Sequence, residues 1–186
     1  MKSSFFASRL ARHFARLARD SRGVSAVEFA MLLPLMLTLY LGGVEVSQGV
    51  SVDRKVTLTA RAVADLAAQS TTITNGEMTN ILDAATAVAS PFPVSQLKVT
   101  VSSVTIDGNG NAKIAWSDAR NATARAVNQV VTVPAALAIP NSTLIWGEVS
   151  YSYTPSIGYV VTGTLNLKDQ IYMRPRLSTA VNRVVS

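Results

Sequence analysis

The sequence predicts an α+β protein with a long N-terminal helix that first spans a membrane and then continues as an amphipathic stem. A second short helix and an antiparallel β-sheet head follow. Residues 24–44 form an apolar run long enough to cross a bilayer as a helix. Residues 45–90 place apolar side chains at spacings of three and four, and from Leu97 the spacing changes to two. We therefore divide the chain into a basic leader (1–23), a membrane helix (24–44), a helical stem with the second helix (45–90) and a β head (91–186).

The apolar run contains one charged side chain, Glu28, about one turn inside its start. A charge in the hydrocarbon core of a bilayer costs on the order of a few kcal/mol, so such a side chain usually has a partner. The alternative is a single-pass anchor whose glutamate reaches the membrane surface. Further along the run, Pro34 removes one backbone hydrogen bond, and we expect a helix kink there.

Basic residues are concentrated before the apolar run. The chain has 17 basic and 11 acidic residues, and those before Val24 are Lys2, Arg9, Arg12, Arg16, Arg19 and Arg22 against Asp20 alone. The excess of arginine before the span predicts a cytoplasmic N-terminus and an external C-terminal domain. The remainder of the chain is nearly neutral, whereas a nucleic-acid-binding domain carries its basic charge on the folded surface. We therefore expect no nucleic-acid partner.

Two helices are predicted after the span. The first continues to about Gln69, because apolar residues recur at helical spacing on one face (Val52, Val56, Ala60, Val63, Ala67). Thr74 and Glu77 form the pattern of a capping box at the start of the second helix. That helix has an apolar stripe (Met78, Ile81, Leu82, Ala85, Val88) and ends at Ser90 before Pro91.

The head is predicted to be an antiparallel sheet. Residues 97–106 alternate, with a change of phase at Ser102 and Ser103 that suggests a bulge. The turn 107–111 leads into a returning strand at Ala112, and 130–133 is a short strand before Pro134. Further strands are expected at 144–153, 159–164 and 165–173, the last ending before Pro175.

Little catalytic chemistry is available. The chain has no cysteine, and its one histidine, His13, lies in the leader. We expect no enzyme, no cofactor and no metal site, although two acids distant in sequence can meet in a fold, as in a carboxylate-pair glycosidase. The side chains of Asp107, Asn109 and Asn111 fit the opening of a calcium loop, but Ala112 stands where that loop needs glycine. The turn is the favoured interpretation.

The start of the apolar run resembles a class III signal, that of the type IV prepilins. In that family a membrane peptidase cuts after a glycine and leaves glutamate as the fifth residue of the mature chain. The resemblance implies a cut between Gly23 and Val24, which places Glu28 fifth. The new α-amine of Val24 is then able to pair with the Glu28 carboxylate of a neighbouring helix, and such a pair is strong in low dielectric.

More residues resemble the TadE-like proteins of the tight-adherence (Flp) pilus system. They are Glu28, Phe29 and Ala30, then Pro34 and Glu45, and near the C-terminus 149–155 followed by 165–174. The resemblance implies a minor pilin or pseudopilin of the inner membrane with a periplasmic head. Its implied partners are the membrane, a prepilin peptidase, other minor pilins and the pilus assembly platform. Two rival functions remain: an uncleaved, signal-anchored periplasmic binding domain, and an envelope enzyme with acids such as Asp107, Asp118, Glu148 and Asp169 gathered in a cleft.

Overall fold

The structure, a computed structural model, describes residues 21–155, 157–158 and 162–185, with the side chains of residues 21 and 22 left undescribed. Most of the leader, residues 1–20 with His13, therefore lies outside the described residues. The chain divides into two compact units, Met1–Val44 and Glu45–Ser186. The elements in chain order are α2 (Ser21–Ala68), β1 (Thr72–Ile73), α3 (Asn75–Ala89), η1 (Val94–Gln96), β2 (Leu97–Ile106), β3 (Ala112–Arg120), β4 (Val130–Val131), η2 (Ala135–Leu137), β5 (Ser142–Tyr153), β6 (Leu165–Met173) and β7 (Asn182–Arg183). The protein is α+β, as predicted.

The first unit contributes the N-terminal part of α2. Residues 23–37 are all exposed, although most of them are apolar. Within the described residues, α2 is the one helix long and apolar enough to cross a membrane, and none of its most apolar window is buried by the chain itself. A helix that is apolar on all sides needs an apolar environment.

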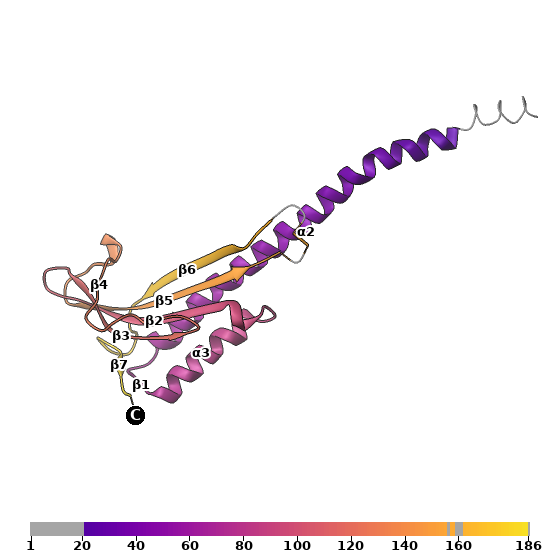
Figure 1. Ribbon diagram of the computed structural model, residues 1–186. Helices are drawn as coiled ribbons and strands as arrows, with labels where there is room; N and C mark the ends of the chain where they lie inside the picture. The colour runs from indigo at the N-terminus through magenta and orange to yellow at the C-terminus, as the bar shows by residue number, and fades with distance from the viewer. Residues whose placement is uncertain (1–20, 156, 159–161, 186) are drawn as a thin grey trace, which may run out of the picture. The chain divides into compact units, whose positions relative to one another are not determined.

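In the second unit, α2 and α3 pack on one face of a sheet (Figure 1). The predicted apolar stripe of α2 is buried at Val52, Val56, Ala60, Val63 and Ala67, and the helix ends at Ala68, one residue before the expected end. The capping box of α3 is present: the Thr74 backbone N–H donates to the Glu77 carboxylate at 2.7 Å, and the Glu77 N–H donates to the Thr74 hydroxyl. Because these contacts are local, the sequence was sufficient to predict them.

The sheet has five antiparallel strands in the order β4-β3-β2-β5-β6. The predicted strand 165–173 corresponds to β6, and the predicted strand 144–153 to β5, which begins two residues earlier at Ser142. A further strand was expected at 159–164. Residues 159–161 lie outside the described residues, and 162–164 are not in a strand.

The predicted bulge lies at the expected place, but the extra residue is in β3 and not in β2. The pairing of β2 with β3 shifts between Ser103 and Val104, which pair with Trp116 and Ile114, so Ala115 is the additional residue. The pairing of β2 with β5 continues without a shift. Trp116 therefore joins the core beneath the helices, whereas Ile114 joins a second cluster on the other face of the sheet.

This second cluster explains the change of phase in β2. Val99 and Val101 face the helices, while Val104 and Ile106 belong to the opposite cluster with Trp146. The segment 121–141, which includes β4 and η2, contributes Val133 and Leu137 to this cluster. Each face of the sheet thus buries apolar side chains at a different end of the strands.

Glycine at position 147 permits close packing of α2 on β5. A Cβ added there would lie 2.9 Å from the carbonyl oxygen of Ala60 and 3.0 Å from the Cβ of Ala64. No larger side chain fits without moving the helix backbone. The close approach of α2 to β5 therefore requires both the small residues of the stem and this glycine.

The C-terminal segment returns to the helices through β7, which pairs in parallel with β1. The Trp116 indole N–H donates to the Val181 carbonyl at 2.7 Å, and Arg183 forms an ion pair with Asp118 at 2.9 Å. Arg183 also donates to Asn75 at the start of α3. Neither β1 nor β7 was predicted.

Strand β6 forms one edge of the sheet, and one of its backbone N–H groups bonds to a side chain of the same strand. The backbone N–H of Gln170 donates to Oδ1 of Asp169 at 2.7 Å. Lys168 and Asp169 are consecutive charged residues on this edge strand.

Candidate functional site

The residues predicted for processing and assembly lie on the first unit's part of α2. Gly23, Val24 and Glu28 are all exposed, with Val24 at 59%. The helix is continuous through them. The structure thus presents a carboxylate on an apolar helix surface, one turn from the predicted new N-terminus.

Glycine at position 23 has no packing role among the described residues. A Cβ added to Gly23 meets nothing within 4 Å, and its φ lies outside the left-handed region. Glycine inside a helix costs about 1 kcal/mol relative to alanine. The reason for glycine here must therefore lie outside the packing of the described chain.

Pro34 lies inside α2, and the helix continues past it. The Thr38 hydroxyl donates to the Pro34 carbonyl at 2.8 Å, a local bond that often accompanies bending of a helix. The predicted kink stays a prediction. Glu45, at the start of the second unit, is 2% exposed, so its carboxylate is buried.

The turn between β2 and β3 satisfies its own polar groups. The Asp107 carboxylate accepts the backbone N–H groups of Asn109 and Asn111, at 2.9 and 2.8 Å, and the Asn111 side-chain amide. The bonds from Asn111 lower the pKa of Asp107 below its ordinary value. Asp118, the twelfth position of the possible calcium loop, lies six residues along β3 from Ala112, about 20 Å at the rise of a strand, and pairs with Arg183. These contacts favour the turn interpretation.

The acids of the possible enzyme site have separate structural partners. Asp118 pairs with Arg183, and Glu148 forms a two-pronged ion pair with Arg125. Asp107 holds the turn. Among the described residues, no group of three or more His, Cys, Asp or Glu side chains gathers where it could bind a metal ion.

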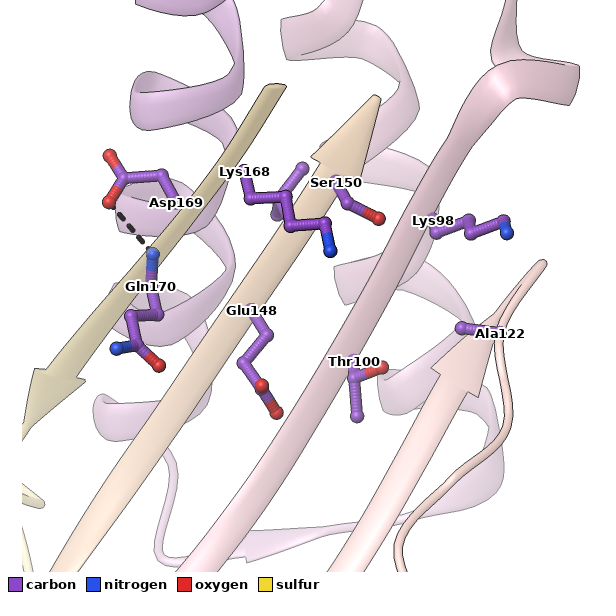
Figure 2. A pocket seen from close by; sticks show the side chains of 9 residues that line it. Lys98, Thr100, Ala122, Glu148, Ser150, Lys168, Asp169 and Gln170 are labelled. Carbon is purple, nitrogen blue, oxygen red and sulfur yellow. Dashed lines mark hydrogen bonds between the residues drawn. The ribbon is translucent and has the colours of Figure 1, made fainter. Parts of the chain in front are cut away.

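An open pocket of about 500 Å³ lies on the sheet face opposite the helices, and Ala122 of segment 121–141 is among the residues that line it. Figure 2 shows its polar side chains rising from three neighbouring strands, β2, β5 and β6. Glu148 and Asp169 both border it, but in Figure 2 the Asp169 carboxylate lies on the far side of β6 from Glu148. The two acids therefore do not face each other as a catalytic pair requires.

An aromatic and cationic group lies next to the pocket. The Arg125 guanidinium lies 4.1 Å from the centre of the Trp146 ring, which stacks on Tyr172 at 5.3 Å. Burial, with a contribution from the Glu148 charge, raises the pKa of Tyr172. Sequence reasoning missed this group because Arg125 is in an irregular segment whose pairing with Glu148 leaves no local pattern.

Comparison with known proteins finds a match over the N-terminal helix. The family model described as TadE-like protein matches residues 23–65, which confirms the resemblance for this segment. The match covers the apolar part of α2 and most of its stem. No curated protein and no solved structure matches the chain.

Proposed function

We propose that this chain, similar to TadE-like proteins over residues 23–65, is a structural subunit of a type IV-like pilus, a minor pilin or pseudopilin. A prepilin peptidase removes the leader after Gly23. The helix that then begins at Val24 stays in the inner membrane and assembles with other minor pilins or the assembly platform. The head lies in the periplasm and becomes exposed at the cell surface when the subunit enters the fibre, and the chain is not an enzyme.

The observation that carries this proposal is the exposed, apolar start of α2. It has one carboxylate, Glu28, and it follows a glycine that the described chain does not need for packing. Among the described side chains no cation pairs with Glu28, and cleavage after Gly23 supplies one. In hydrocarbon each charge alone is heavily penalised, so an ion pair between the Val24 amine and Glu28 of a neighbouring subunit sets the stagger of the helices.

The first test is the intact mass of the protein extracted from membranes. The proposal requires a chain that begins at Val24, and Gly23→Ala should accumulate the longer precursor because the peptidase needs glycine at the cut. Gly43→Ala is the matched control, since a Cβ at Gly43 also meets nothing within 4 Å. A native chain that keeps its leader would instead favour the signal-anchored periplasmic binding domain.

The second test addresses the ion pair. Glu28→Ala should leave membrane insertion intact and strongly reduce incorporation into pili, measured by co-purification of partner subunits. Glu28→Asp keeps the charge and should retain part of the assembly. Normal piliation with Glu28→Ala would overturn the ion-pair role while leaving the processing site intact.

A further inference from the structure

The pocket on the open face of the sheet is organised in rows that cross three strands. Lys98 pairs with Ser150, and Ser150 pairs with Lys168, so these three residues form one row. Thr100, Glu148 and Gln170 form the next row in the same way. Since neighbouring strands lie about 4.8 Å apart, the two lysine Cα atoms are about 10 Å apart, with a serine between them.

The two lysines have no counter-charge. The nearest acid on this face, Glu148, is neutralised by Arg125 at 2.7–3.0 Å. Asp169 accepts a backbone N–H, and its carboxylate points away from the row (Figure 2). Within the described residues, neither Lys98 nor Lys168 forms an ion pair or hydrogen bond, and the Ser150 hydroxyl is also without a partner.

We propose that the row Lys98–Ser150–Lys168 binds an oxyanion, a carboxylate or phosphate group. In Figure 2 the Lys168 ammonium lies toward Ser150, whereas the Lys98 ammonium points away from it. Both are on flexible stems that can turn toward an anion at Ser150, and lysine binds such groups as a point charge. An anion held between them removes their mutual repulsion and receives up to three hydrogen bonds. The pocket of about 500 Å³ has the size of a small-molecule site, and the row Thr100–Glu148–Gln170 offers donors and acceptors to the rest of the ligand.

This binding site is independent of the proposed pilus function, because it uses residues of the head and needs neither cleavage nor the membrane helix. An oxyanion can come from a free small molecule or from a larger carrier. The chemistry recognised is the same, so the probes are chosen to separate phosphate from carboxylate.

The experiment titrates the full chain in detergent with inorganic phosphate, and separately with acetate, at ionic strength held constant with sodium chloride. The ε-methylene signals of ¹³C-labelled lysine report the binding by NMR. The signals of Lys98 and Lys168 should shift and saturate for at least one probe, while that of Lys113, an exposed lysine on β3, should not. Saturation by phosphate alone assigns a phosphate-bearing ligand, and saturation by acetate alone assigns a carboxylate.

The variant Lys98→Met with Lys168→Met should weaken binding about ten- to a hundredfold, because each charged hydrogen bond is lost. Lys113→Met makes a charge change of the same kind and should leave the affinity unchanged. Lys98→Arg with Lys168→Arg keeps both charges and should retain most of the binding. Uniform, non-saturating shifts of all lysines with both probes, or equal affinity of the wild type and the double methionine variant with an unchanged tryptophan spectrum, would overturn the proposal.

Discussion

Two stretches of helix α2 differ in the burial of their apolar side chains. In residues 23–37 of α2 every side chain is exposed, and the apolar residues are large and distributed all round the helix. From Val52 to Ala68 a single stripe is buried, and it is made of valine, alanine and Thr59. The number of apolar residues in a helix therefore does not show whether the rest of the protein buries them.

The arrangement and size of the apolar residues make the difference. The stem uses small residues, Ala60 and Ala64, where it approaches Gly147, and charged residues such as Arg54 and Arg61 remain exposed on other faces. Such a helix is built for a protein partner on one side. The first stretch offers no preferred face, as expected where lipid or several neighbouring helices surround it.

The largest expected effect comes from adding one methyl group on the packed stretch. Gly147→Ala should lower the free energy of unfolding of the head by about 1–3 kcal/mol, because the new Cβ overlaps the Ala60 carbonyl and Ala64. Both tryptophans, Trp116 and Trp146, are in the head, so tryptophan fluorescence during denaturant unfolding in detergent reports on the head alone. Gly43→Ala, with open space around its Cβ, should leave the midpoint unchanged. Equal effects of the two variants would contradict the close packing.

A buried and an exposed valine on the same helix give the second test. Val56 is 2% exposed and Val27 is 57% exposed. Val56→Ala should destabilise the head by about 2 kcal/mol through lost burial and a cavity, whereas Val27→Ala should have no measurable effect on tryptophan-detected unfolding. A Val27→Ala effect as large as that of Val56→Ala would show that the apolar stretch packs on the head.

The smallest expected effect is on the pH dependence of stability, through the capping box at the start of α3. The apolar stretch of α2 has no such capping box among its described residues. The bonds from Thr74 lower the pKa of Glu77. A carboxyl whose pKa is lowered by folding stabilises the protein above its ordinary pKa, and this contribution is lost as the pH falls through the lowered value. Unfolding measured from pH 6 down to pH 3 should therefore show an acid loss of stability that is smaller in Glu77→Gln. Identical pH profiles of the wild type and Glu77→Gln would show that the Glu77 carboxylate does not contribute to the acid loss of stability.

Local patterns in the sequence predicted much of the fold. The capping box at Thr74, the turn at Asp107 and the strand 165–173 each depend on residues close together in sequence, and the structure confirms them. The buried face of the stem followed from spacing alone. These features can be predicted without knowing which other elements pack against them.

Features that depend on distant residues were missed or misplaced. The strand pair β1–β7 joins Thr72 to Asn182, and two residues in each strand leave no periodic signal. The phase change at Ser103 was visible, but only the pairing with β3 shows that Ala115 is the extra residue. The burial of Glu45 also depends on the folded head, so no local pattern of residues indicates it. The lysine row was likewise invisible, since Lys98 and Lys168 are brought together only by β5.

The Asp169 carboxylate on the edge strand β6 has a consequence for how copies of this chain can join. A free strand edge is a template on which another chain can add a strand, and charged residues on the edge oppose such addition. Here Asp169 already accepts the N–H of Gln170, a group that an incoming strand would need, and Lys168 adds a charge that it would have to desolvate. Intermolecular β-sheet extension is therefore unfavourable at this edge.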